Sequence, residues 1–290
     1  MVRKKSLVAV SLIAAAFLGT SAADAKKPRD DFFNPQKPGT RLKLFGFFGP
    51  GFRATLENRT QLEEDMSEAH TQIIGDVNPG YAEGSANLDV RVFILSFGAS
   101  VGVRNDWHIL RFEPDPQTGL DHGERELNRE ARWLKDYDYD WREKVWPWYE
   151  GRFRVIMPMY NFMGISTLHV RFQDRGFDNA FDWQTSTVMD SGVYAQWESF
   201  LVIRDKHLGF AGPALRVLWV PRGAAEGDER HDLDFHYGVL AGTQAGPGNR
   251  DLILLRFYTT LGLDDPFMGT HAFRAPIQIV FGYQADFSLF

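Results

Sequence analysis

The end of the chain alternates apolar and polar residues with a period of two. In the run APIQIVFGYQADFSLF, apolar residues recur at every second position from Ile277 to Leu289, with Gln278, Gln284 and Asp286 between them. Such alternation predicts a β-strand with one apolar and one polar face. The run is more than twice as long as an ordinary strand of about 5–6 residues. A strand of this height is expected where a sheet crosses a membrane.

The same alternation recurs along most of the chain, separated by turn formers rich in Gly, Pro, Asp and Asn. We predict one strand within 41–63, a hairpin over 86–112 that turns near Phe97-Gly98, strands at 149–158, 162–173, 191–204, 208–220, 233–244 and 250–263, and the strand that ends the chain. The segment between the first strand and the hairpin is expected to be an outer loop. This segmentation predicts ten strands. Twelve is the alternative, because Gly49-Pro50-Gly51 would add a turn.

The connectors between these runs alternate in length. Those at 113–148, 174–190, 221–232 and 264–275 are long, whereas those at 158–162, 204–208 and 245–249 are short. Alternating long and short connectors are typical of an up-and-down membrane barrel with tight periplasmic turns and extended outer loops. If Phe290 ends in the periplasm, every short turn lies on the periplasmic side. We therefore predict an all-β fold, a single antiparallel transmembrane barrel.

The N-terminus has the pattern of an export signal. Arg3, Lys4 and Lys5 precede an apolar stretch from Leu7 to Leu18, and the run Ala-Asp-Ala at 23–25 fits a signal peptidase site. The apolar stretch is shorter than the roughly 20 residues of a spanning helix. We predict a cleaved signal peptide at 1–25, a flexible periplasmic lead-in at 26–40 and a barrel domain at 41–290. The chain has no Cys, so it holds no disulfide.

From Arg41 to Phe290, and in its export signal, the chain resembles a bacterial outer-membrane β-barrel protein of Gram-negative bacteria. The resemblance implies a location in the outer membrane, contact with its lipid, insertion by the barrel-assembly machinery and a monomeric state. A secreted soluble sandwich also has alternating strands. Strand height, unequal connectors and aromatic residues at strand ends, such as Trp146, Trp148, Trp219 and Phe287, favour the membrane barrel.

The charge of the chain is mildly acidic. Removal of residues 1–25 takes away three positive charges and one negative charge, which changes the net charge from −6 to −8. This balance argues against a nucleic-acid partner.

The polar faces of the predicted strands carry both arginines and carboxylates. We predict that the lumen is lined by Arg53, Arg59, Arg91, Arg104, Glu150, Arg152, Arg154, His169, Arg171, Glu198, Arg216, Asp234, His236 and Arg256. One interpretation is a packed, salt-bridged interior, because buried charges need partners. The other is a narrow channel for small anionic or zwitterionic solutes, with Arg152, Arg154 and Arg171 as its most basic wall. Glu150, Glu198 and Asp234 are the expected carboxylate partners.

We predict no catalytic, cofactor-binding or metal site. Lipid-modifying barrels place a His and a Ser two positions apart on one strand, and no His of this chain has Ser two positions later. This absence makes a lipid-modifying enzyme only the second alternative to the passive barrel.

Within the long loop, GERELNREARWL at 123–134 predicts a short amphipathic helix. This helix would be a cap or a ligand-binding lid over the outer mouth. The acidic run KDYDYDW that follows is expected to be a solvated surface rather than a calcium site.

Overall fold

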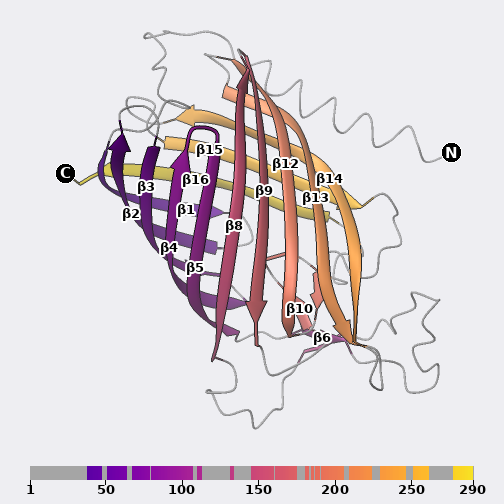
Figure 1. The fold of residues 1–290 in the computed structure, drawn as a ribbon. Coiled ribbons are helices and arrows are strands. Elements are labelled where there is room, and N and C mark those ends of the chain that lie inside the picture. The colour runs from indigo at the N-terminus through magenta and orange to yellow at the C-terminus, as the bar shows by residue number, and fades with distance from the viewer. Residues whose placement is uncertain are drawn as a thin grey trace, which may run out of the picture.

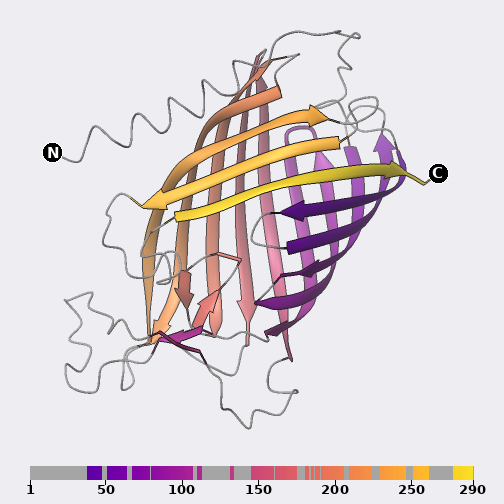
Figure 2. The same cartoon turned by 180° about the vertical axis from the view of Figure 1, so that it is seen from behind.

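A closed, twelve-stranded antiparallel barrel forms the protein (Figures 1 and 2). The structure, a computed structural model, describes residues 38–47, 51–63, 67–78, 80–106, 110–112, 131–133, 145–159, 161–174, 180–182, 184–185, 187–189, 191–205, 209–223, 229–245, 251–260 and 277–289. The predicted signal peptide, most of the lead-in, residues 123–130 of the predicted helix and the acidic run lie outside this set.

Each barrel strand pairs with two neighbours. The strands are β1 (Gly39–Phe47), β2 (Gly51–Glu63), β3 (Ser67–Val77), β4 (Tyr81–Val92), β5 (Leu95–Asp106), β8 (Val145–Met159), β9 (Phe162–Gln173), β12 (Gly192–Asp205), β13 (Gly209–Gly223), β14 (Glu229–Ala245), β15 (Asp251–Thr260) and β16 (Ile277–Ser288). Strands β1 and β16 pair over Arg41–Phe47, with Leu42 opposite Phe287, and this pairing closes the barrel.

The prediction of ten strands is wrong, and the alternative of twelve is confirmed. The predicted first strand corresponds to two strands, β1 and β2, and all of β1 pairs with residues 51–59 of β2. The segment after it was expected to be an outer loop, yet it contains β3. On β3, His70 and Asp76 face the interior and Ile73 faces outward. Gly75 interrupts the outward apolar positions of β3, which makes the alternation of this strand weak in the sequence.

The hairpin of β4 and β5 turns four residues before the predicted position. Its tip is Phe93-Ile94 rather than Phe97-Gly98. Phe93 has a φ of 54°, in the left-handed region that a two-residue hairpin turn requires. A bulky residue rarely adopts this φ. The preference of turns for glycine therefore led to the prediction of a turn at Gly98 instead.

The two ends of the barrel differ in their connectors. At the end that holds both the start of β1 and the end of β16, the connectors are 64–66, 93–94, 160–161, 206–208 and 246–250. We call this the turn end. At the other end, the loop end, they are 48–50, 78–80, 107–144, 174–191, 224–228 and 261–276. The connector expected to be long at 221–232 is short, because β13 and β14 continue to Gly223 and from Glu229.

The outer face of the barrel is apolar. On β5, Phe97, Val101 and Val103 are exposed, whereas Ser100 and Arg104, which have the opposite phase, are buried in the interior. Leu215 and Trp219 on β13 are likewise exposed and Arg216 is buried. A monomeric protein in water rarely exposes such a continuous apolar surface, which suggests a membrane around it. In the part of the chain that the structure describes, no helix is long and apolar enough to span a membrane.

Two of the aromatic residues expected in an interfacial girdle point inward instead. Trp146 and Trp148 are buried, since they share the inward phase of β8 with Glu150. Each ring faces an arginine: Arg104 lies 5.2 Å from the Trp146 ring and Arg171 lies 3.8 Å from that of Trp148. Cation–π contact with a desolvated guanidinium stabilises both groups.

A second, small sheet lies at the loop end, which is the lower end in Figure 1. Its strands are β6 (Leu110–Phe112), β7 (Ala131–Trp133), β10 (Ala180–Asp182) and β11 (Thr187–Met189), in the order β11-β10-β6-β7. The helix predicted for 123–134 is therefore wrong over 131–133. Backbone pairing of Ala131–Trp133 with β6 takes precedence there over the weak helical spacing of the sequence.

Adjacent isoleucines of β3 provide a test of the two faces. Ile73 is 64% exposed on the outer face, whereas Ile74 lines a polar cavity in the interior. Arginine on the lipid face of a barrel costs about 2–4 kcal/mol near the midplane. We expect Ile73→Arg to lower the free energy of unfolding by that amount and Ile74→Arg to lower it less, as measured by denaturant titration in lipid vesicles. Equal losses would mean that the outer face does not contact lipid.

Candidate functional site: the barrel interior

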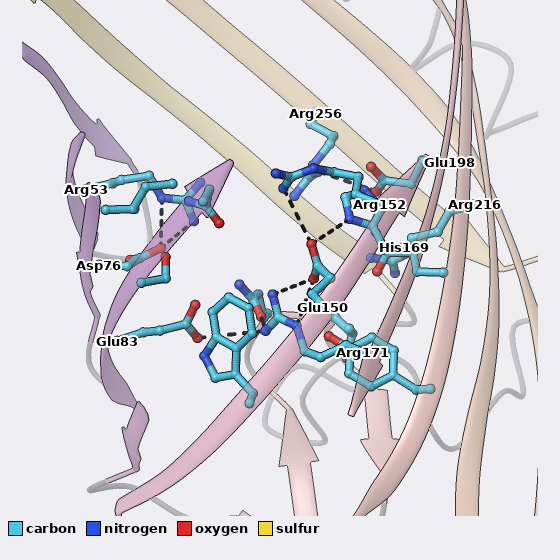
Figure 3. Close-up of a pocket in the computed structure, with 18 residues that line it drawn as sticks. Arg53, Asp76, Glu83, Glu150, Arg152, His169, Arg171, Glu198, Arg216 and Arg256 are labelled. Carbon is cyan, nitrogen blue, oxygen red and sulfur yellow. Dashed lines mark hydrogen bonds and ion pairs between the residues drawn. The ribbon is translucent and has the colours of Figure 1, made fainter. Parts of the chain in front are cut away.

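The interior contains a charged cavity of about 230 Å³ (Figure 3). Arg53, Asp76 and Glu83 lie on one side of it, and Glu198, Arg216 and Arg256 lie on the opposite side. Glu150 and Arg171 stand between them. These residues come from eight strands, β2, β3, β4, β8, β9, β12, β13 and β15, so only the closed barrel assembles the cavity.

One group of side chains, the Glu150 cluster, joins β8 and β9. Glu150 accepts hydrogen bonds from Arg171 (Nε, 2.9 Å) and contacts the ring nitrogen Nδ1 of His169 at 3.1 Å and Nη1 of Arg152 at 3.5 Å. The register explains this, because Glu150 stands opposite Arg171 and Arg152 stands opposite His169. Arg152 also forms a two-point pair with Asp89 of β4, at 2.9 and 3.1 Å. Its guanidinium is therefore fully matched by carboxylates.

A second group, the Glu198 cluster, consists of Glu198, Arg216, Arg256 and Tyr258. Glu198 contacts Arg256 Nη1 at 3.5 Å and accepts a hydrogen bond of 3.4 Å from the hydroxyl of Tyr258. The guanidinium of Arg216 lies 4.7 Å from the centre of the Tyr258 ring. Arg216 donates to two neutral acceptors, His236 Nδ1 at 3.0 Å and Gln278 Oε1 at 2.6 Å. Within the described residues, the carboxylate of Glu198 therefore pairs with Arg256, and Arg216 has only neutral acceptors.

A third group of charges lies on β1 to β3. The carboxylate of Glu57 is buried and contacts Lys43 at 2.7 Å, His70 at 3.0 Å and Arg59 at 3.5 Å. Nearer the loop end, Arg53 donates through Nε and Nη2 to one carboxylate oxygen, Oδ2, of Asp76. Lys43, Arg59 and Arg53 each have a carboxylate partner, as a buried charge requires.

Residues of the connector between β9 and β12 fold into the loop end of the barrel. Asp182 and Thr185 are buried, and Asp182 accepts hydrogen bonds from the backbone N–H groups of Gln184 and Thr185, both at 2.8 Å. We call Asp182, Gln184 and Thr185 the plug. The guanidinium of Arg104 on β5 binds Asp182 at 3.1 Å and Asp106 at 2.8 Å. The plug is thus anchored to the barrel wall by a buried ion pair.

Gln184 ties the plug to two more strands. Its side-chain oxygen accepts a hydrogen bond of 2.8 Å from Arg171 on β9. Its backbone carbonyl accepts one of 3.1 Å from Gln278 on β16. Because Gln278 also accepts from Arg216, the plug and the Glu198 cluster share one hydrogen-bond network.

The predicted lumen residues divide into two sets. Eight line the cavity: Arg53, Glu150, Arg152, His169, Arg171, Glu198, Arg216 and Arg256. The other six, Arg59, Arg91, Arg104, Arg154, Asp234 and His236, lie on the inward phase of their strands outside the cavity lining. Glu150 serves several cations as expected, whereas Glu198 pairs with Arg256.

The expected basic wall of Arg152, Arg154 and Arg171 is largely neutralised, because Glu150 and Asp89 pair with Arg152 and Arg171. Two sets of cavity residues were missed. Asp76 and Glu83 fell in the presumed outer loop, and Gln184 and Thr185 fell in a connector without periodicity. Alternation within 67–77 was the signal that would have revealed Asp76.

No protein-family model and no curated protein matches the chain. Among solved structures, one chain described under "Unveiling the Mechanism Behind the in-meso Crystallization of Membrane Proteins" is similar with a TM-score of 0.43 and 8% sequence identity. The similarity covers 86% of this chain and 83% of that chain. At this level it carries no information on activity.

Removal of the charge of Glu150 tests the interior network. Breaking a buried ion pair by removing one partner costs about 3–5 kcal/mol. We expect Glu150→Gln to lower the free energy of unfolding by about this amount, because Arg152, His169 and Arg171 lose their shared carboxylate. As a control, Asp286→Asn removes the single 3.4 Å contact with the partly exposed Arg41 near the turn end and should cost less than about 1 kcal/mol. Similar losses for both variants in denaturant titrations would contradict this network.

Proposed function

We propose that this chain is an integral protein of the bacterial outer membrane, with a closed, ion-paired interior, a structural or passive role and no catalytic activity. The exposed apolar face supports a lipid environment. The export signal in the sequence supports the outer membrane in particular. Lipid would cover the outer face, and the barrel-assembly machinery would insert the chain. A monomer is sufficient, because a closed barrel leaves no strand edge to pair.

The plug is the observation that supports a passive role most strongly. Asp182 is 1% exposed inside the loop end, where it binds Arg104. Beneath the plug, the Glu150 cluster and Arg152–Asp89 extend side chains from β4, β8 and β9 into the interior. Long side chains that pair across a barrel of this size leave little room for a continuous water path.

A narrow channel for small anionic or zwitterionic solutes is the second candidate. The cavity below the plug favours it, because it holds space for several waters or one small solute. Such a channel would need the plug to move. The plug is part of the connector between β9 and β12, so displacement of this segment would open the loop end.

A lipid-modifying enzyme has less support. Ser166 accepts a hydrogen bond of 2.6 Å from Trp197, an exposed residue of the outer face, whereas His169 lies inside beside Glu150. Because they lie on opposite faces of β9, they cannot act as a nucleophile and its base.

Location is tested by cell fractionation. We expect the mature chain in the outer-membrane fraction, extractable only by detergent, because the apolar face needs lipid or detergent cover. Release by osmotic shock alone would identify a soluble periplasmic protein and refute the membrane assignment.

Conductance tests the plug. In planar bilayers we expect low conductance for the natural chain and a several-fold increase for Asp182→Ala, which removes the anchor to Arg104 and the acceptor for two backbone N–H groups. Asp174→Ala is the matched control, because Asp174 is exposed at the start of the same connector. High conductance in the natural chain, unchanged by either substitution, would show that the plug does not close the barrel.

A further inference from the structure

The two sides of the cavity differ in how well their charges are matched. On the side of β8 and β9, Arg152 and Arg171 each lie within 4.0 Å of carboxylates on two different residues. On the side of β12, β13 and β15, the Glu198 cluster contains two arginines and one carboxylate, and that carboxylate contacts Arg256. Positive charge therefore exceeds negative charge locally.

Arg216 is the most unusual member of this side. It is 1% exposed, and among the described residues it forms no ion pair. Its Nη2 atom is buried and has no hydrogen-bond partner there. A buried cation with only neutral acceptors is costly, and a missing partner costs still more. The ring of Tyr258 offsets part of this cost, but a ring cannot replace an anion.

Two further arginines near Arg216 are incompletely paired. The side chain of Arg256 is 29% exposed and has one contact of 3.5 Å with Glu198. Arg154 donates to the hydroxyl of Thr167 at 3.3 Å and, within the described set, contacts no carboxylate. Strand register places Arg154, Thr167, Glu198 and Arg216 opposite one another on β8, β9, β12 and β13. They form one inward row with a single negative charge.

The number of hydrogen-bond donors exceeds the number of acceptors. Each guanidinium carries five N–H donors, and these three arginines donate only to Thr167, His236, Gln278 and Glu198 among the described residues. Asp234 on β14 is the next carboxylate along this wall, and in the part of the chain that the structure describes Arg216 donates to His236 and Gln278 rather than to Asp234. Arg216 and Arg256 line the cavity of about 230 Å³, and Arg154 lies outside its lining.

We infer that the cavity binds a small oxyanion, a carboxylate or a phosphate, at the Glu198 cluster, with Arg216 and Arg256 as the principal cations and Arg154 beside them. The planar guanidinium fork matches the two oxygens of such an anion. Glu198 holds Arg256 in place but competes with the ligand for its charge. This site does not depend on conduction, since the ligand need only enter the cavity.

The probes are sodium acetate and sodium phosphate, compared with sodium chloride at equal ionic strength on the full mature chain in a neutral maltoside detergent. We expect either oxyanion to raise the melting temperature by about 3 °C or more at saturation. A response to acetate alone or to phosphate alone would support the site and identify the ligand class. A melting temperature that is the same in all three salts would overturn the inference.

Three variants locate the site. Arg216→Gln and Arg256→Gln should each weaken oxyanion affinity about tenfold or more, whereas Glu198→Gln should tighten it about tenfold because a nearby negative charge is removed. Arg53→Gln is the matched control: Arg53 lines the same cavity on its opposite side and is ion-paired with Asp76, so its loss should change the affinity less than twofold.

The three variants also keep the inference testable if one of them does not fold. If Arg216→Gln does not fold, Arg256→Gln and Glu198→Gln still predict opposite shifts, which a general loss of stability cannot produce. An equal loss of affinity in Arg53→Gln and Arg256→Gln, or weaker binding in Glu198→Gln, would show that the oxyanion does not bind at the Glu198 cluster.

Discussion

Pairing of β1 with β16 is the interaction on which the rest of the structure depends. Once this ladder forms, every barrel strand has two neighbours and no backbone edge remains on the wall. The wall can then present apolar side chains outward without exposing unpaired N–H and C=O groups to lipid. The same closure forces all alternate side chains into one confined interior, where their charges must find partners.

The interior meets that requirement through strand register. The pairing of β8 with β9 places Glu150 opposite Arg171. Asp89 on β4 binds Arg152. Aromatic rings separate some of these groups: Tyr81 and Trp146 lie beside Arg104, and Trp148 lies beside Arg171. The interior is therefore a layered arrangement of guanidinium groups, carboxylates and rings, and the charge surplus at Glu198 departs from an otherwise matched pattern.

Alternation predicted most of the barrel because period two is a direct consequence of strand geometry. It succeeded for β9 and β16 and failed for β3, where small and polar residues weaken the outward face. It also failed to show that parts of the interior are apolar. Leu218 and Val220 of β13 point inward and pack with Tyr194, but the nearly continuous apolar run ALRVLWV hides which residues face inward.

The charged interior was predictable as a set of residues, but its pairings were not. Alternation places Arg104, Arg216 and Glu198 on inward faces, yet Arg104 binds Asp182 from 78 residues away and Arg216 binds Gln278 from 62 residues away. Such partners depend on barrel closure and on the path of a connector, neither of which has a periodic signature.

The position of Gln278 has a consequence for the order of assembly. Gln278 is at the start of the last strand, and it both donates to the plug and accepts from Arg216. The plug can reach its complete set of hydrogen bonds only after β16 has joined the wall. Sealing of the interior is thus coupled to the incorporation of β16, so a barrel that lacks this strand also has an incompletely fastened plug.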